Sequence, residues 1–215
     1  DIVLVGDSLG MVVLGFPDTT HVTLDHMLHH VEATARGVKN ALLVGDMPIH
    51  SYDTVEQAVQ SAKKLFLAGA DAVKLEGGAA QAGNIRAIVE AGIPVVGHIG
   101  LLPQKVLEEG GYKIKGKSSA EEEALVRDVE AVVVEGVTPH AARQVTVHSS
   151  IPTLGIGSGS HTCDGDVVVI HDLVGAFPWF IPAFVKPRAD VAGSMTAAVK
   201  EWMEDCYTEP GSISS

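Results

Sequence analysis

The sequence predicts an α/β fold, a (β/α)8 barrel of the TIM type whose first strand is missing from this chain. Short runs of Val, Leu, Ile and Ala alternate with stretches of helical periodicity, and strands that are apolar throughout are typical of a parallel sheet covered on both faces. Three successive runs, IVLVGD, ALLVGD and AVKLE, also end in a carboxylate. Active sites of parallel barrels lie at this end of the strands.

Length and composition favour one globular enzyme domain. The 215 residues predict a single catalytic domain over residues 1–215, slightly short for a complete barrel. A net charge of −12 without a dense basic patch disfavours nucleic acid and anionic membranes as partners. No apolar stretch is long enough to span a membrane. Two cysteines, Cys163 and Cys206, fit neither a disulfide framework nor a metal motif, which favours reduced thiols in the cytoplasm.

In the first half of the chain, local patterns predict each element. Apolar residues at helical spacing indicate a helix after the first strand, and Thr54 with Gln57 forms a capping-box pattern that opens the next helix. Gly69 and Gly92 end helices. The predicted order after the first strand is helix 24–36, strand 41–47, helix 54–68, strand 71–76, helix 80–91 and strand 94–100.

The second half begins with a charged, glycine-rich segment, residues 101–119, which is typical of a mobile active-site loop. Ser119 with Glu122 predicts a helix start, and Thr138 with Pro139 predicts another. The further elements expected are strand 131–137, helix 139–147, a strand running into a glycine-rich turn over 151–160, strand 166–172 and a terminal helix at 190–206.

Two irregularities appear in this pattern. Only seven strands are predicted, and because the chain opens directly in a strand, we expect the absent one to have preceded residue 1. The run RDVEAVVVEG passes from helix to strand without the glycine-containing break found elsewhere. We therefore expect one to two helical turns to be missing near residue 130.

The strand-end acids Asp7, Asp46 and Glu76 predict a metal site. Consecutive parallel strands lie about 4.8 Å apart, so the three carboxylates should surround one point. Oxygen ligands favour a hard cation, and Mg²⁺ combines a few carboxylates with water and substrate oxygens. Each acid alone could instead cap the following helix, but three uncompensated acids side by side would repel one another.

Other polar residues join the acids at the strand ends. Lys74 leaves the same face of its strand as Glu76 and could clamp a substrate carboxylate or neutralise the acids structurally. Glu135, across the barrel, is a candidate general base, or an acid that caps the next helix. His98 is either a packed hydrogen-bonding residue or a catalytic one. Ser8 could offer its hydroxyl to substrate or merely begin a loop.

A divalent ion, an anion clamp and a separate carboxylate base suit proton abstraction next to a carbonyl. The ion would chelate the keto and carboxylate oxygens of an α-keto acid and stabilise the enolate as charge develops. The enolate would then attack a carbon electrophile.

The motifs VGDSLG, LLVGDMP, VKLEGG, GHIGLLPQ, GGYKIKGK, VVVEGVTP and GIGSG occur in this order. Together they closely resemble the ketopantoate hydroxymethyltransferase (3-methyl-2-oxobutanoate hydroxymethyltransferase) family over residues 1 to about 205. The resemblance implies a magnesium-dependent (β/α)8 enzyme of pantothenate and coenzyme A synthesis. Such an enzyme transfers a hydroxymethyl group from 5,10-methylenetetrahydrofolate to 3-methyl-2-oxobutanoate and forms 2-dehydropantoate.

By the family's pattern, the metal site is Asp7, Asp46 and Glu76. The same pattern places the keto acid on Asp7, Ser8, Asp46 and Lys74, and makes Glu135 the proton acceptor. The resemblance also implies a large cytoplasmic homo-oligomer. This sequence departs from the family in lacking a strand before VGDS and in its shorter helix before VVVEG, and the absence of both would prevent normal barrel closure.

Two rival interpretations remain open. A magnesium barrel of the phosphoenolpyruvate mutase and isocitrate lyase kind also forms enolates of α-keto acids, but those enzymes typically use a lid-loop residue such as cysteine, and residues 101–119 contain none. The second rival is a non-catalytic barrel remnant that serves only as an assembly subunit.

Overall fold

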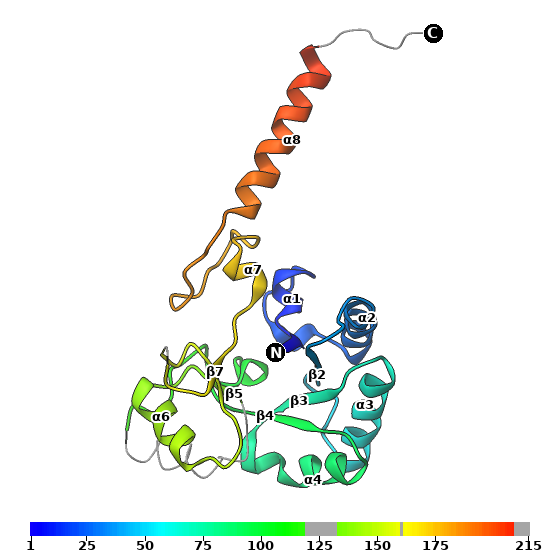
Figure 1. Cartoon of the computed structure of the whole chain (residues 1–215), viewed down its shortest axis with the longest axis vertical. Helices are drawn as coiled ribbons and strands as arrows, with labels where there is room; N and C mark the ends of the chain where they lie inside the picture. Colours follow the sequence, from blue (N-terminus) through cyan, green and yellow to red (C-terminus); the bar gives the residue numbers. More distant parts are fainter. Residues whose placement is uncertain (119–132, 160, 209–215) are drawn as a thin grey trace. The chain divides into compact units, whose positions relative to one another are not determined.

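The computed structural model of the chain describes residues 1–118, 133–159 and 161–208 (Figure 1). It divides into two compact units, Asp1–Val167 and Val168–Ser215. The first contains the whole sheet and every predicted site residue. The single-domain interpretation of residues 1–215 stays a prediction.

The first unit is built on a curled, parallel sheet of seven strands that pair in chain order from β1 to β7 (Figure 1). Every neighbouring pair is parallel, and this confirms the α/β barrel-type architecture. The strands are β1 (Ile2–Val5), β2 (Leu42–Asp46), β3 (Ala72–Glu76), β4 (Val95–Gly100), β5 (Val133–Glu135), β6 (Leu154–Ile156) and β7 (Gly165–Asp166).

Helices connect the strands and lie outside the curled sheet (Figure 1). The side chains of Thr54 and Thr138 cap their helices as predicted, by accepting from the backbone N–H groups of Gln57 and Ala141. The capping box expected at Thr54 is incomplete, because the Gln57 side chain accepts from the backbone N–H of Asp53 instead of that of Thr54. The longer helices of this unit are α2 (Leu24–Ala35), α3 (Val55–Leu67), α4 (Ala82–Glu90) and α6 (Pro139–His148), and the short ones are α1 (Leu9–Val12), η1 (Thr19–His21), η2 (Gly78–Gln81) and η3 (Pro103–Lys105).

The main core lies between the first strands and helices α2 and α3, and it fixes the strands that carry the acids. Its fully buried members include Met27 and Val31 of α2, Leu65 of α3, and Leu43 and Leu75 of the sheet. The close approach of these layers also requires a glycine. Gly69 ends α3 with φ +109°, and a Cβ there would lie 2.7 Å from the Cβ of Ala35.

The prediction of a strand over 166–172 is wrong. Strand β7 ends at Asp166, the backbone N–H of Val167 makes one further bond to the carbonyl of Gly155, and Ile170–Leu173 forms the short helix α7. Val168 and Ile170 are 41% and 58% exposed. The β-branched run suggested a buried strand, but strand preference depends on packing against neighbours, which these side chains lack.

Some expectations fall outside the described residues. These are the helix that starts at Ser119, the first two residues of strand 131–137, and the shortened connection near residue 130. The loop over 101–119 is described to residue 118. It begins with η3 and is joined to the strand-end region where the backbone N–H of Lys115 donates to the carbonyl of Gly136. Its mobility stays a prediction.

The second unit contains α7 and the terminal helix α8 (Val191–Thr208), which confirms the predicted helix at 190–206. Exposed apolar side chains are frequent on α8, among them Met195, Trp202 and Tyr207. No helix in the described part of the chain is both long and apolar enough to cross a bilayer.

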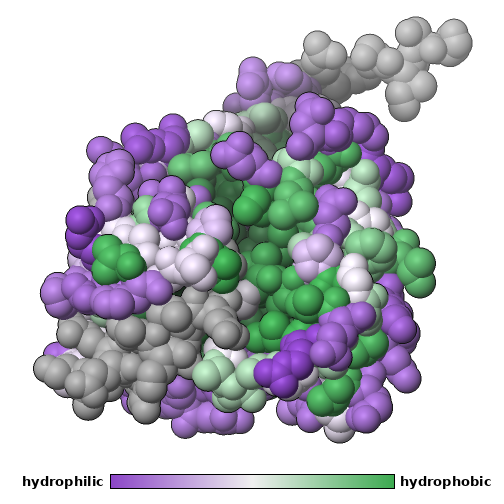
Figure 2. Space-filling view, turned by 60° about the horizontal axis from the view of Figure 1, so that its bottom comes forward, coloured by the Kyte–Doolittle hydropathy of each residue, from purple (hydrophilic) through white to green (hydrophobic). Residues whose placement is uncertain are grey.

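On the face of the molecule shown in Figure 2, apolar residues line a central hollow bordered by hydrophilic ones.

Candidate active site

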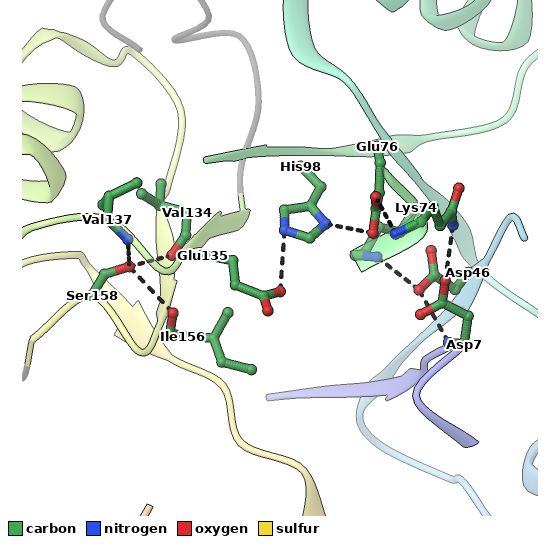
Figure 3. Close-up of polar contacts among 11 residues, drawn as sticks. Asp7, Asp46, Lys74, Glu76, His98, Val134, Glu135, Val137, Ile156 and Ser158 are labelled. Atoms are coloured by element: carbon green, nitrogen blue, oxygen red, sulfur yellow. Dashed lines mark hydrogen bonds and ion pairs between the residues drawn. The ribbon is translucent and has the colours of Figure 1, made fainter. Parts of the chain in front are cut away.

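The acid cluster, defined as Asp7, Asp46 and Glu76, forms at the carboxyl ends of β1, β2 and β3 (Figure 3). Asp7 comes two residues after β1, whereas Asp46 and Glu76 are the last residues of their strands. All three are at most 4% exposed. The backbone N–H of Asp7 donates to Oδ2 of Asp46 at 3.2 Å. The structure thus brings together the acids that the sequence predicted to converge.

Lys74 is the cation of this cluster. It is 4% exposed, and its Nζ donates to Oδ2 of Asp46 at 2.7 Å. Burial alone would lower the pKa of Lys74, but attraction to Asp46, Asp7 and Glu76 outweighs burial and raises it. Lys74 is therefore held charged inside the protein. This agrees with the second of its two predicted roles, in which the lysine neutralises the acids structurally.

The carboxyl group of Asp7 lies among charged neighbours of both signs. Burial, followed by repulsion from Asp46, raises the pKa of Asp7 well above its ordinary 3.8, although Lys74 and Gln104 act in the opposite sense. Asp7 therefore holds its proton more tightly than a free aspartate does, and a cation bound beside the acid cluster would favour its ionised form.

We expect Asp7→Asn to stabilise the protein when no metal ion is bound. A raised folded-state pKa means that folding favours the protonated carboxyl, so its stabilising contribution is full below pH 3.8 and is lost as pH rises through the folded pKa. Asparagine keeps an oxygen that can accept from Gln104 and cannot ionise. The gain in unfolding free energy over the native chain should therefore be larger at about pH 8 than at about pH 5.

Urea unfolding in EDTA at about pH 5 and about pH 8 measures this gain. Asp25→Asn is the control, because Asp25 is an exposed acid at the start of α2. Its effect on stability should not grow with pH in the same way. The explanation is wrong if the Asp7→Asn gain is the same at both pH values.

His98, on β4, connects the acid cluster to Glu135 on β5 (Figure 3). Its Nδ1 lies 3.4 Å from Oε1 of Glu76 and its Nε2 lies 3.2 Å from Oε2 of Glu135. Burial and Lys74 act to lower the pKa of His98, but Glu135 and Glu76 outweigh them and raise it to about 9. The ring is thus held between two carboxylates, and Glu135, whose side chain is 20% exposed, is the more accessible of the two.

Gln104 is the site residue that sequence reasoning missed. It lies in η3, at the start of the 101–118 segment, and is 3% exposed. Its side-chain Nε2 donates to Oδ2 of Asp7 at 2.9 Å, and its backbone N–H donates to Oε2 of Glu76 at 3.1 Å. The sequence did carry one signal for it. Gln104 directly follows Pro103 in the segment after β4, and the strands on both sides of β4 end in acids.

Two serines near the strand ends differ in what they contact: Ser8, which the sequence singled out, and Ser158, which it did not. Ser8 opens α1 and is half-buried beside Asp7, with no side-chain cap bond. Ser158, in the predicted glycine-rich turn, is buried, and its hydroxyl donates to the carbonyl of Val134 and accepts from the backbone N–H of Val137 (Figure 3). Ser158 thus fastens β5 to the turn after β6, whereas Ser8 stays available to a ligand.

The residues of the acid cluster suit a hard divalent cation. Oδ1 of Asp46 is a buried oxygen without a hydrogen-bond donor, and Oε1 of Glu76 has the ring of His98 at 3.4 Å; carboxylate oxygens of this kind are the ligands that Mg²⁺ prefers. Among the described residues, no three His, Cys, Asp or Glu side chains form a complete metal-binding set, so coordination by all three acids stays a prediction. Mg²⁺ needs only one or two carboxylates besides water and substrate oxygens.

Known proteins with similar sequences share one description. The family model of ketopantoate hydroxymethyltransferase matches residues 1–210. A 3-methyl-2-oxobutanoate hydroxymethyltransferase from Oleidesulfovibrio alaskensis is 46% identical, with 95% of this chain and 74% of the relative covered. A protein of the same name from Moorella thermoacetica is 47% identical, with 95% and 80% covered.

Solved structures support the fold. A protein described as a phosphonomutase from Burkholderia cenocepacia J2315 superposes with a TM-score of 0.62 at 12% identity, covering 93% of this chain and 83% of that one. A 2,3-dimethylmalate lyase of the PEP mutase/isocitrate lyase superfamily gives 0.55 at 17% identity, covering 100% and 78%. At such identities the likeness concerns architecture alone. The sequence matches are decisive: the chain belongs to the ketopantoate hydroxymethyltransferase family.

Proposed function

We propose that this protein is a magnesium-dependent enzyme of pantothenate synthesis. It transfers a hydroxymethyl group from 5,10-methylenetetrahydrofolate to 3-methyl-2-oxobutanoate and forms 2-dehydropantoate. The proposal is supported by family membership and by one structural observation above all. A buried acid cluster that holds the ammonium of Lys74 faces a separate, partly exposed carboxylate, Glu135, across His98.

In this proposal the acid cluster holds Mg²⁺, and Asp7, Ser8, Asp46 and Lys74 hold the keto acid. When bound, the ion supplies positive charge that stabilises negative charge developing on the keto oxygen. The ammonium of Lys74, already fixed by Asp46 at 2.7 Å, attracts the substrate carboxylate. Holding both ends of a small acid limits its rotation, so that its C3–H bond faces one direction.

Glu135 is the proton acceptor. Its carboxylate takes the C3 proton as the C–H bond breaks, and the electron pair left behind gives the enolate. Water adds to the methylene carbon of the folate as its bonds to N5 and N10 break, so tetrahydrofolate leaves with the two protons of that water and the carbon is freed at the oxidation level of formaldehyde. The enolate carbon then forms a bond to this carbon, and its oxygen takes the proton held by Glu135 to give the hydroxyl of the product. The contact between Nε2 of His98 and Oε2 of Glu135 at 3.2 Å fixes the direction of the carboxylate.

A product assay tests the proposed function. The protein is incubated with Mg²⁺, 3-methyl-2-oxobutanoate and 5,10-methylenetetrahydrofolate, and 2-dehydropantoate is measured by mass spectrometry. Formation that requires all three components is expected. Cleavage of 2-methyl-substituted malates or turnover of phosphonopyruvate without folate would favour the mutase and lyase alternative instead.

We also propose a cytoplasmic homo-oligomer. The exposed apolar side chains of α8, which include Met195, Trp202 and Tyr207, support the oligomer, because exposed apolar surface often marks an interface between proteins. Analytical ultracentrifugation should give a mass of several subunits, and a monomer at micromolar concentration would contradict it. An oligomer without keto-acid or magnesium binding would favour the assembly-subunit alternative.

A further inference from the structure

We propose that Gln104 is a positioning residue that holds Asp7 and Glu76 in the arrangement required for magnesium binding, with Tyr52 fixing the orientation of its amide. The inference rests on the magnesium site of the proposed function. It concerns a residue that touches two members of the acid cluster but is itself neutral and has no role in the chemistry.

Gln104 contacts two acids from two different strands. Its Nε2 donates to Oδ2 of Asp7 at 2.9 Å, and its backbone N–H donates to Oε2 of Glu76 at 3.1 Å. Two carboxylates that lack a cation repel each other and tend to turn apart. A neutral donor to each one opposes that movement without adding a positive charge that would compete with a metal ion.

Every polar atom of the Gln104 side chain has a partner, so its amide has one possible orientation. The second Nε2 hydrogen bond goes to the carbonyl of Met47 at 3.0 Å, and Oε1 accepts from the hydroxyl of Tyr52. If the amide were reversed, its oxygen would face the Met47 carbonyl, which can only accept, and its nitrogen would face the hydroxyl of Tyr52. Tyr52, itself 9% exposed, therefore acts on Asp7 through Gln104.

The residues that the Gln104 side chain contacts lie far from it in the sequence. Asp7 and Gln104 are 97 residues apart, and Tyr52 and Gln104 are 52 apart. The start of the 101–118 segment is thus joined to Asp7 through the side chain of Gln104 and to Glu76 through its backbone N–H. Hydrogen-bond partners of metal ligands typically contribute about 10- to 100-fold to metal affinity, and a residue that only tethered this segment would leave that affinity unchanged.

Calorimetric titration of the full-length protein with Mg²⁺ tests the assignment. Gln104→Met keeps the side-chain length and removes both Nε2 bonds, so the Kd for Mg²⁺ should rise by about 10- to 100-fold. Tyr52→Phe removes only the hydroxyl and should raise it by about fivefold. Glu108→Gln is the matched control, because Glu108 is an exposed residue of the same segment, and its Kd should equal that of the native chain.

A double variant separates positioning from a general loss of structure. If Tyr52 acts through Gln104, Tyr52→Phe should add no further loss of affinity in the Gln104→Met background. Fully additive losses would overturn this part of the assignment. Circular dichroism melts verify that each variant is folded. If Gln104→Met does not fold, the Mg²⁺ affinity of Tyr52→Phe still tests the role of Gln104.

The steady-state constants provide a second readout. Gln104→Met should raise the Mg²⁺ concentration needed for half-maximal rate, while kcat at saturating Mg²⁺ stays within about threefold of the native value. Native Mg²⁺ affinity in both single variants would overturn the role of Gln104 and leave the proposed function standing. Absence of Mg²⁺ binding in the native chain would overturn both proposals together.

Discussion

Replacing Glu135 with glutamine should lower turnover by about 10²- to 10⁴-fold, the usual contribution of a positioned general base. The amide keeps the shape of the side chain and can still contact Nε2 of His98, which lies 3.2 Å from Oε2 in the native chain. It cannot accept the C3 proton. The affinities for Mg²⁺ and for 3-methyl-2-oxobutanoate should stay close to native, because Glu135 lies outside the acid cluster.

Product formation gives the rate and calorimetry gives the two affinities. Glu90→Gln is the control, because Glu90 is an exposed acid at the end of α4, and it should leave both unchanged. Turnover at the native rate in Glu135→Gln would assign the proton transfer to another group. A fall in Mg²⁺ affinity as large as the fall in rate would place Glu135 in the metal site instead.

Asp46→Asn should weaken the binding of magnesium and of the keto acid together. Asp46 accepts from Lys74 at 2.7 Å and from the backbone N–H of Asp7 at 3.2 Å, and its Oδ1 is a buried oxygen without a donor. Asparagine keeps the volume and one oxygen but removes the charge. We expect the Kd for Mg²⁺ to rise by about 100-fold, equivalent to about 2.7 kcal/mol.

Asp71→Asn is the matched control for this substitution. The Asp71 carboxylate accepts from the backbone N–H of Leu43 at 2.9 Å just before β3 begins, at the opposite end of the strand from Glu76. Its replacement should cost stability without changing either affinity. Native affinities in Asp46→Asn would remove Asp46 from the binding site.

The fold and the acid cluster could be predicted because both follow from short-range patterns. Apolar runs define the strands, and the parallel pairing of β1, β2 and β3 in chain order then places Asp7, Asp46 and Glu76 at one end. Lys74 was placed with them by the two-residue period of a strand. Its partner among the three acids is settled only by the side-chain geometry, which selects Asp46.

Gln104 and the bridging position of His98 could not be predicted in the same way. Gln104 reaches Asp7 from a loop 97 residues away, and no periodicity specifies where a loop side chain turns. The sequence placed His98 at a strand end but left open a structural or a catalytic role. Its ring contacts both acids because β3 pairs Glu76 with His98, while β5 places Glu135 two residues further along, opposite Gly100, from where its side chain still reaches the ring.

The failed strand at 166–172 has a different cause. The run DVVVIHD has the composition of a buried strand, yet the sheet ends after Asp166 and Ile170–Leu173 turns into α7. Composition predicts that a segment suits a sheet, but it does not supply a neighbouring strand or a covering layer.

The central claim is that Glu135 and the acid cluster together remove the C3 proton of a bound keto acid. Proton NMR in D₂O tests it most directly, by following the C3–H signal of 3-methyl-2-oxobutanoate with the native chain and Mg²⁺ but without folate. The account predicts that this signal disappears through exchange, and that EDTA stops the exchange. A signal that persists in the folded, magnesium-saturated protein would contradict the account.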